Sequence, residues 1–340
     1  MSHPENYVVY RFEEKDGDLK RATVAWKEPK KGEVIVKVLA CGICGTDDHV
    51  RSQFFPTGFP RVPGHEVVGD IVAVHPDETN YKVGERVGSG WHGGHCGTCA
   101  ACKTGDYLTC EHEDVNGVWR DGGVAEYAAL RVEALSRVPE DMDPAEVAPL
   151  FCAGVTTFNA LRNMKVMPGD IVAVQGIGGL GHLAIQYSRA MGFRTVALST
   201  SAAKKDLATK LGAHDYIDGS QVDQAQALQA MGGARVILCT APSGKAIAKL
   251  LPGLGTGGQL VILGISEEAS TINFTALIAR RQSIIGWPTG TAADVDDTLS
   301  FSKLQDVHCM VQRFPLEKAQ EAYEHKASAK FRAVIVPGLQ

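Results

Sequence analysis

The sequence lacks an uncharged apolar segment at its N-terminus, and it has no apolar run long enough to span a membrane. Charged residues are spread over the first twenty positions, where a secretory signal needs a continuous apolar core. The longest weakly polar stretch, residues 171–187, is interrupted by glycines and by His182. These absences predict a cytoplasmic protein with no transmembrane segment and no membrane partner.

A concentrated basic surface is also lacking. The chain carries a net charge of -5 and has a pI near 6.1, whereas binding to nucleic-acid phosphates needs clustered lysine and arginine. The densest basic group, Lys27, Lys30 and Lys31, is typical of a solvated turn. We therefore expect no nucleic-acid partner.

A disulfide framework is not expected either, because the cytoplasm keeps thiols reduced. The nine cysteines cluster, and clustered cysteines in such a chain favour metal ligands. They form a pair at Cys41 and Cys44, a group of four, and three single residues. The group of four is Cys96, Cys99, Cys102 and Cys110, and the single residues are Cys152, Cys239 and Cys309.

The chain of 340 residues is long enough for about two domains. Residues 33–75 have the alternating texture of β-strands, and residues 80–125 are rich in Gly, Cys and His with little periodicity. From 169 to about 286, short apolar strands alternate with helical patterns, as in a parallel sheet covered on both faces. We therefore predict an α/β fold whose last strand, within residues 331–338, rejoins the first domain.

The first strand of the alternating region leads into a glycine-rich loop that matches G-x-G-x-x-G and opens a helix. Glycines there permit a tight turn and a close approach of the backbone to a pyrophosphate, and the helix N-terminus offers free N–H groups. This context predicts a dinucleotide site. Its residues are Gly176, Ile177, Gly178, Gly179, Leu180 and Gly181.

The end of the next strand indicates which dinucleotide is bound. A carboxylate there would bind the ribose 2′-hydroxyl of NAD(H) and repel a 2′-phosphate. This chain instead has Ser199, Thr200 and Ser201, followed by Lys204 and Lys205, and hydroxyl and ammonium groups favour a phosphate. We predict NADP(H) rather than NAD(H); the alternative for the two lysines is an exposed helix face.

The group of four cysteines has the spacing of a structural zinc site. Four thiols within fifteen residues of a glycine-rich loop can close a tetrahedral Zn–S4 site with no open position. Such a site stabilises a loop and does not catalyse. Because four thiolates complete the coordination, we interpret the nearby His92, His95 and His112 as surface residues.

A second metal candidate starts from residues 41–50, CGICGTDDHV. Its Cys-x-x-Cys is compatible with a redox pair, with half of a zinc site or with an incidental turn. A catalytic zinc needs three protein ligands and one open position, and Cys44 and His65 supply two of the three. Spacing does not identify the third ligand, for which all three single cysteines are candidates.

In their order, these motifs resemble the zinc-dependent alcohol dehydrogenases of the medium-chain dehydrogenase/reductase superfamily. The resemblance runs through Cys-Gly-Ile-Cys-Gly-Thr-Asp from residue 41, Gly-His-Glu from 64, the four cysteines, Phe-Cys-Ala-Gly-Val-Thr-Thr from 151 and the glycine loop. It implies a GroES-like β-rich catalytic domain and a Rossmann cofactor domain. The implied segments are 1–150, with a structural zinc lobe at about 91–115; 151–286 for the Rossmann domain; and 287–340 for a return to the catalytic domain.

The resemblance also implies roles that spacing leaves open. It implies hydride transfer between an alcohol or aldehyde and a nicotinamide, with two zinc ions per chain. It assigns the ligands of the catalytic zinc, a carboxylate that can approach the metal, a residue that orients the ligand histidine, and a proton path. The ligands of the catalytic zinc are Cys44, His65 and Cys152, and Glu66 is the carboxylate that can approach the metal. Asp47 orients the ligand histidine, and Thr46 with His49 forms the proton path. Cys41 is then a packing residue, and Asp48 has no assigned role.

The resemblance further implies cofactor and substrate contacts. Thr156 would adjoin the nicotinamide, and Arg332 would contact cofactor phosphate. An aromatic substrate pocket, suited to medium-chain or aryl aldehydes and alcohols, is expected from Trp91, Phe54, Phe55 and Trp287.

The sequence departs from well-known members of the family at two places, and the family also implies an oligomeric state. The Ser-Thr-Ser sequence is similar to the cinnamyl-alcohol-dehydrogenase-like, NADP-dependent branch, and Gly45 lacks the basic side chain that some relatives have there. Relatives of this length are homodimers or homotetramers, and the expected partner is a small-molecule substrate.

Two alternatives are enzymes of related scaffolds, and a third belongs to another class. A polyol or other secondary-alcohol dehydrogenase would use the same scaffold. A zinc-free quinone or enoyl reductase is disfavoured, because it would lack Cys44, His65 and Cys152 together. A non-catalytic zinc or redox-sensing protein would use the cysteines but would have no need for Thr46, His49 or the glycine loop.

Overall fold

The computed structural model describes residues 3–326 and 328–339, which fold into two compact units. The first unit takes in the chain up to Val155, Thr289–Lys303 and the chain from His308 on. The second unit comprises Thr156–Pro288 and Leu304–Val307. The division into functional segments at residues 150 and 286 stays a prediction.

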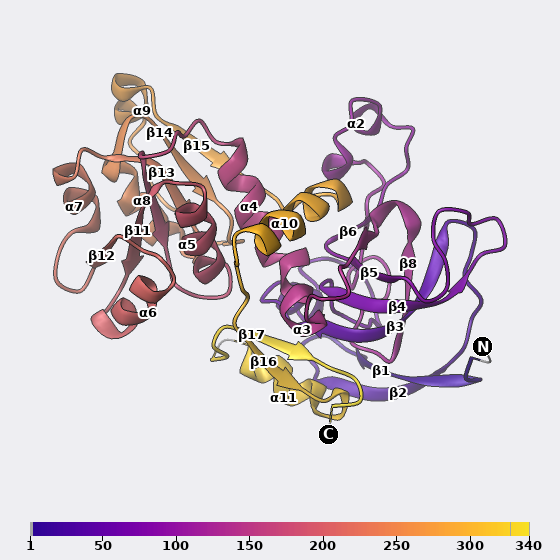
Figure 1. Ribbon diagram of the computed structural model, residues 1–340. Coiled ribbons are helices and arrows are strands. Elements are labelled where there is room, and N and C mark those ends of the chain that lie inside the picture. The colour runs from indigo at the N-terminus through magenta and orange to yellow at the C-terminus, as the bar shows by residue number, and fades with distance from the viewer. Residues whose placement is uncertain (1–2, 327, 340) are drawn as a thin grey trace. The chain divides into compact units, whose positions relative to one another are not determined.

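The first unit is built on a mainly antiparallel sheet, ordered β16-β17-β3-β4-β5-β9 with β8 paired to β3. Because β17 pairs with β3, the C-terminal strand lies beside a strand from near the N-terminus (Figure 1). The strands of this sheet are β3 (Glu33–Gly42), β4 (Val67–Val74), β5 (Arg86–Ser89), β8 (Tyr127–Arg131), β9 (Ser136–Arg137), β16 (Val311–Phe314) and β17 (Arg332–Ile335).

Shorter elements surround this sheet. Two small antiparallel pairs are β1 (Asn6–Phe12) with β2 (Leu19–Ala25), and β6 (His92–Gly94) with β7 (Asp114–Val115). The helices are α1 (Asp47–Arg51), α2 (Ala100–Lys103), α3 (Pro144–Val147), α10 (Ala292–Leu304) and α11 (Ala319–His325). The 3₁₀ turns are η1 (Tyr107–Thr109), η2 (Val132–Ala134), η3 (Ala148–Phe151) and η6 (Leu316–Lys318).

The second unit has a six-stranded sheet ordered β12-β11-β10-β13-β14-β15, in which every neighbouring pair is parallel. This order is that of the doubly wound dinucleotide-binding folds and confirms the α/β class. The strands are β10 (Ile171–Gln175), β11 (Arg194–Ser199), β12 (Asp215–Asp218), β13 (Ala234–Cys239), β14 (Leu254–Ile262) and β15 (Ser283–Gly286).

Helices connect these parallel strands, as right-handed crossovers require. They are α5 (Gly181–Ala190), α6 (Lys205–Lys210), α7 (Gln224–Ala230), α8 (Gly244–Leu250) and α9 (Phe274–Arg280), with the 3₁₀ turns η4 (Ala202–Lys204) and η5 (Leu251–Gly253). One further helix, α4 (Ala153–Asn163), begins in the first unit and continues into the second.

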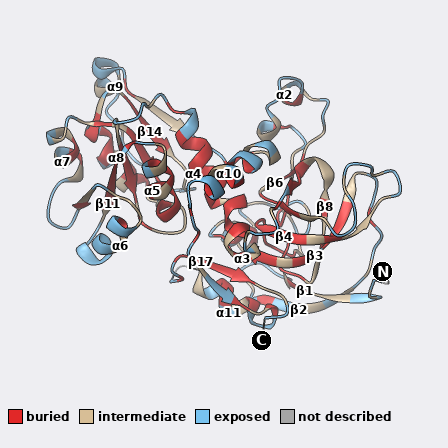
Figure 2. Ribbon diagram, viewed as in Figure 1, coloured by how far each residue is buried: buried red, intermediate tan, exposed pale blue. Residues whose placement is uncertain are grey.

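Each unit has its own apolar core on its sheet, where Figure 2 shows the buried residues concentrated. In the first unit, β3 is central: Val34 and Val36 are fully buried, and Val36 pairs with Ile71 on one side and Ala128 on the other. β-Branched residues suit such a strand, because their stiff side chains pack well on a pleated surface.

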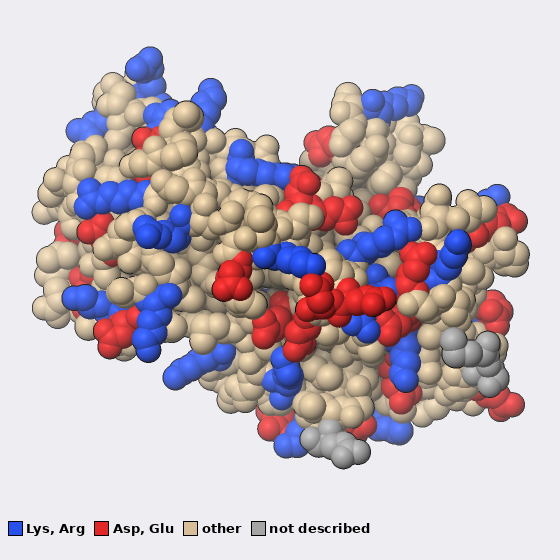
Figure 3. All heavy atoms as spheres, viewed as in Figure 1, with Lys and Arg blue, Asp and Glu red and all other residues tan. Residues whose placement is uncertain are grey.

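The outer surface carries charges of both signs. On the face drawn in Figure 3, basic and acidic side chains are interspersed. Among the residues that the structure describes, none of the helices combines the length and apolar character that a membrane span requires.

Val36→Ala tests the central place of β3. Removing two methyl groups from a fully buried site should lower the free energy of unfolding by about 2 kcal/mol. Val83→Ala, the same change at a side chain that is 45% exposed, should leave it within about 0.5 kcal/mol. Urea unfolding followed by tryptophan fluorescence measures both; equal losses would contradict the packing described.

Candidate active site

Strand pairing brings the first candidate ligands together. β3 ends at Gly42, two residues before Cys44, and β4 begins at Val67, two residues after His65. The register pairs Cys41 with Val67 at the end of β3 and the start of β4. The segments that carry Cys44 and His65 therefore lie at the same end of these two strands. Cys152 follows η3 and completes the group from a distant part of the chain.

The resulting group has the dimensions of a metal site. Ligand atoms of Cys44, His65, Glu66 and Cys152 all lie within 4.8 Å of one another, and the two sulfurs are 3.9 Å apart. Two thiolates bound at about 2.3 Å to one tetrahedral zinc lie about 3.8 Å apart. The donors, two sulfurs and one imidazole, are those that zinc prefers.

Unpaired polar atoms support the same conclusion. His65 is 1% exposed, and among the described residues neither of its ring nitrogens has a hydrogen-bond partner. Asp47 lies 3.5 Å from Nδ1, and buried polar atoms without partners are rare in folded proteins, so Nε2 indicates a missing partner. The pKa of Cys44 lies well below its ordinary value because of a hydrogen bond with Cys152 and the nearby His65. The group therefore fits a zinc ion.

The turn after Cys44 carries the residues expected to assist. The Cys44 backbone N–H donates to Asp47 Oδ2 at 2.9 Å, and Asp47 Oδ1 lies 3.5 Å from His65 Nδ1. The Thr46 hydroxyl oxygen accepts from Cys44 Sγ at 3.5 Å. Asp47 is therefore placed to orient the imidazole, and Thr46 adjoins a ligand sulfur.

Glu66 and Arg332 form a buried ion pair beside this group. The Arg332 guanidinium donates to Glu66 Oε1, while Glu66 Oε2 has no partner among the described residues. Burial raises the pKa of Glu66 to about 7. The resemblance implied a phosphate contact for Arg332, whereas its guanidinium contacts Glu66; the phosphate contact stays a prediction.

The four other cysteines form a separate group. Their sulfurs lie 3.6 Å (Cys110 to Cys96), 3.9 Å (Cys99 to Cys110) and 4.0 Å (Cys96 to Cys102) apart. Hydrogen bonds from Thr98 lower the pKa of Cys96 to about 5, which favours the thiolate. Four thiols at these separations fit a closed tetrahedral zinc site.

The interpretation of His92 as a surface residue is wrong. Its side chain is 4% exposed, its Nε2 lies 3.1 Å from His95 Nδ1, and the two rings stack. The ring of His95 stacks in turn on Tyr107. The histidines before the four-cysteine group therefore pack the base of this lobe.

Aromatic rings extend from the first metal group. Trp91 packs edge-on against His65 at 5.2 Å between ring centroids, and Phe55 packs against Trp91 at 5.8 Å. Phe54 and His49 join this cluster, and the ring centroids of His49 and Phe54 are 4.9 Å apart. Trp287 belongs to the second unit.

Trp119, which sequence reasoning missed, packs on Phe55 at 6.4 Å between ring centroids. Its ring is 42% exposed although Val118 before it is fully buried. No local spacing marks this residue, because its neighbour Phe55 lies far away in the sequence.

In the second unit, the glycine loop joins β10 to α5. Gly176 has φ of +89°, and a Cβ on Gly181 would lie 1.9 Å from the Gly176 carbonyl oxygen. A Cβ on Gly178, by contrast, would meet no described atom within 4 Å. The loop thus needs glycine for its own shape at two positions and leaves open space at the third, as the close approach of a pyrophosphate would require.

The residues expected to select the dinucleotide lie near this loop. Ser199 ends β11, and Lys204 donates from its Nζ to the Ile177 carbonyl at 2.6 Å. Lys204 is therefore directed at the glycine loop, while Lys205 begins α6 and is exposed.

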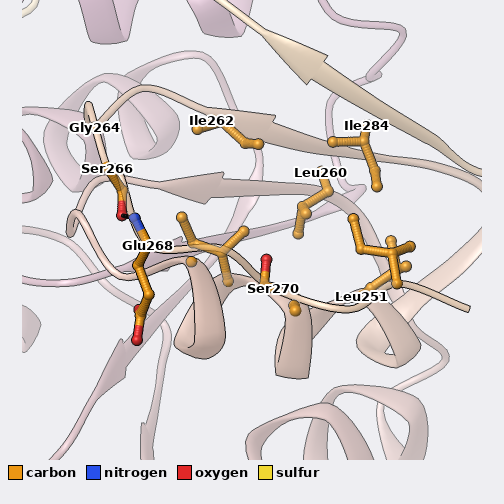
Figure 4. Close-up of a pocket in the computed structure, with 12 residues that line it drawn as sticks. Leu251, Leu260, Ile262, Gly264, Ser266, Glu268, Ser270 and Ile284 are labelled. Atoms are coloured by element: carbon orange, nitrogen blue, oxygen red, sulfur yellow. Dashed lines mark hydrogen bonds between the residues drawn. The ribbon is translucent and has the colours of Figure 1, made fainter.

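A small cavity of about 150 Å³ lies elsewhere in the second unit, between α8, η5 and the strands β14 and β15 (Figure 4). It contains none of the site residues expected from the sequence. Its walls are mostly apolar, with Leu251, Leu260, Ile262 and Ile284 labelled in Figure 4 beside Ser266, Glu268 and Ser270.

Two family models match, one within the first unit and one mainly within the second. Residues 30–140 match the family described as the alcohol dehydrogenase GroES-like domain, and residues 179–303 match the zinc-binding dehydrogenase family. The match with the first family includes Cys44, His65 and the four-cysteine group. The second match starts within the glycine loop.

Individual proteins are similar over almost the whole chain. The alcohol dehydrogenase patD of Penicillium expansum is 46% identical over 334 residues, which cover 98% of each chain. A cinnamyl alcohol dehydrogenase from Sorghum bicolor has a TM-score of 0.88 and 29% identity, covering 97% of each chain. A zinc-binding dehydrogenase from Sinorhizobium meliloti, bound to NADP, has a TM-score of 0.91 and 25% identity, covering 98% of this chain and 100% of the other.

A pair of glycine substitutions tests the loop. In Gly181→Ala the new methyl group would overlap a backbone oxygen that cannot move aside, so the thermal unfolding midpoint should fall by several degrees. Gly178→Ala, the same change in open space, should keep the wild-type midpoint but weaken binding of the dinucleotide. Differential scanning calorimetry and cofactor titration measure these effects; equal midpoints for the two variants would refute the loop geometry.

Proposed function

Because the chain belongs to the zinc-dependent alcohol dehydrogenases of the medium-chain dehydrogenase/reductase superfamily, we propose that its reaction takes place at Cys44, His65 and Cys152 and uses NADP(H). The chain is an oxidoreductase of alcohols and aldehydes. The observation that carries the proposal is that two thiols and one imidazole, whose ligand atoms lie within 4.8 Å of one another, meet in one buried group. The named relatives and the zinc-binding dehydrogenase match favour an enzyme over a non-catalytic zinc or redox sensor.

The proposed chemistry divides among the residues of the first unit. A zinc ion, when bound, supplies a positive charge that lowers the pKa of an alcohol hydroxyl or polarises a carbonyl. Thr46 accepts the proton of the alcohol, and His49 carries it toward solvent. Asp47 holds the His65 ring in its ligating orientation. A nicotinamide cofactor, which the glycine loop of residues 176–181 would hold, would accept a hydride from the carbinol carbon, and the alcohol would become a carbonyl compound.

The preference for NADP(H) rests on the end of β11. Ser199, Thr200 and Ser201 have hydroxyl donors where a carboxylate would repel a 2′-phosphate, and Lys204 adds a positive charge beside the glycine loop. The relative from Sinorhizobium meliloti, bound to NADP, supports this choice. Thr156 is proposed to adjoin the nicotinamide.

Two zinc ions per chain are proposed. The first serves the reaction, and the second, held by Cys96, Cys99, Cys102 and Cys110, stabilises the lobe and has no open position. We further propose a cytoplasmic homodimer or homotetramer. The rings of Trp91, Phe55 and Phe54 cluster beside His65 and support substrates with an apolar chain or an aryl group. The role of Trp287 stays a prediction.

Zinc content and activity test the site assignment. Cys44→Ala and His65→Ala should each lower kcat/KM at least about a thousandfold, because the charge that stabilises the developing alkoxide is lost. Elemental analysis should find two zinc ions per wild-type chain and one in Cys44→Ala. Cys99→Ala should lose the other ion and the stability of the lobe.

Cys41→Ala is the matched control, because Cys41 is a buried neighbour outside the group of ligands. It should keep both zinc ions and the wild-type kcat/KM. Full activity in Cys44→Ala or His65→Ala would show that the assignment is wrong.

Cofactor kinetics test the role of Lys204. Lys204→Met should raise KM for NADPH about tenfold, equivalent to about 1.4 kcal/mol, and leave KM for NADH nearly unchanged. Lys210→Met, in the last turn of α6, is the control and should change neither. An equal rise in KM for both cofactors would mean that Lys204 supports the glycine loop and does not select the 2′-phosphate. A tenfold preference of the wild-type enzyme for NADH would overturn the proposal.

A further inference from the structure

The proposed mechanism leaves Asp48 without a role, although its neighbours Asp47 and His49 both have one. Its side chain contacts the C-terminal helix α11 and the turn after it. Asp48 Oδ1 accepts a hydrogen bond from the Tyr323 hydroxyl and lies 3.0 Å from Lys326 Nζ. We call Asp48, Tyr323 and Lys326 the Asp48 cluster.

The helix that carries Asp48 cannot hold its own position. α1 has five residues, and helices much shorter than about 12 residues are marginal without tertiary contacts. Its N-cap residue, Thr46, makes no side-chain capping hydrogen bond. The placement of Thr46 and Asp47 at the metal group therefore depends on contacts that α1 makes with other elements.

One set of these contacts reaches the turn between β1 and β2. Arg51 donates to the carbonyl oxygens of Asp16 at 2.7 Å and of Gly17 at 2.9 Å. The same turn is bound to α11, because Gln320 accepts from the Leu19 N–H at 2.8 Å. The β1–β2 turn thus contacts both α1 and α11.

The Asp48 cluster adds a direct contact between α1 and α11. Tyr323 is 2% exposed, and its ring packs edge-on against Phe12 at 5.4 Å. Lys326 places its ammonium 3.7 Å from the centroid of the Tyr323 ring, and its side chain is only 16% exposed. Burial, together with Asp48, raises the pKa of Tyr323 well above its ordinary value, so the hydroxyl remains a donor.

The two contacts of Asp48 differ in strength. Asp48 itself is half exposed, so solvent screens its ion pair with Lys326. The hydrogen bond from the buried Tyr323 hydroxyl matters more, because losing its charged acceptor would leave a buried polar group unpaired. Tyr323 is accordingly the stronger of the two restraints on α1.

We propose that Tyr323 and Lys326 are positioning residues, which hold Asp48 and thereby fix Asp47 and Thr46 of the α1 segment at the zinc group. The inference rests on the proposed function, in which Asp47 orients His65 and Thr46 accepts the substrate proton. The C-terminal helix thus acts on the reaction without touching the substrate.

Two near-isosteric substitutions test the proposal. Tyr323→Phe removes one hydroxyl and keeps the ring that packs on Phe12. Asp48→Leu removes the acceptor of both contacts and keeps a side chain of similar size. Each should lower kcat about tenfold and speed the loss of zinc to a chelator, because a small displacement of catalytic groups is costly. KM for NADPH should stay within about twofold, since the glycine loop lies in the other unit. The double variant should be no worse than the poorer single variant.

Matched controls separate positioning from general stability. Tyr81→Phe removes a hydroxyl that donates to the Leu135 carbonyl at 3.2 Å in the same unit, away from α1. It should keep the wild-type kcat and the wild-type rate of zinc loss. If Tyr323→Phe behaves like Tyr81→Phe in both measurements, the proposal is wrong.

A lysine pair covers the case in which Tyr323→Phe does not fold. Lys326→Met should lower kcat and speed zinc loss, whereas Lys318→Met, which breaks an exposed pair with Glu321, should change neither. Equal behaviour of the two lysine variants would overturn the proposal. If Cys44→Ala is inactive and the Asp48 cluster variants are normal, only the positioning role fails; if Cys44→Ala is active, the proposed function fails.

Discussion

The structure depends on one long-range meeting of side chains. The sulfurs of Cys44 and Cys152 lie 3.9 Å apart although the residues are 108 positions apart in the sequence, and both are grouped with His65. The pairing of β3 with β4 brings His65 close to Cys44, and Cys152 directly follows η3. Burial of the His65 imidazole with its Nε2 unpartnered among the described residues is unfavourable in an apolar core, because buried polar atoms without partners are costly. A bound cation accounts for all three side chains.

The C-terminal segment completes a site that the N-terminal strands begin. A Cβ at Gly42 would overlap the Glu66 carboxylate, so this carboxylate occupies space that only glycine leaves free. Arg332 at the start of β17 balances its charge, and α11 reaches Asp48 on the other side of the ligand turn. The return of the chain to the first unit therefore serves the metal group directly, in addition to extending the sheet.

Periodicity and spacing predicted the features that are local in the sequence. Short apolar strands alternating with helices predicted the parallel sheet, and four cysteines within one loop predicted the group that the structure brings together. Spacing left the third ligand open among three cysteines, because it carries no information on long-range contacts; only the resemblance to the family implied Cys152. His92 was misread because its burial comes from stacking on His95, and Tyr323 was missed because its partner Asp48 lies far away in the sequence.

Anomalous diffraction would locate the metal proposed at Cys44, His65 and Cys152. Crystals of the purified enzyme with NADPH would be measured on both sides of the zinc absorption edge. Two anomalous peaks per chain are expected, one among these three side chains and one among the four cysteines of the lobe. The absence of a peak at Cys44, His65 and Cys152, with the lobe occupied, would contradict the proposed site.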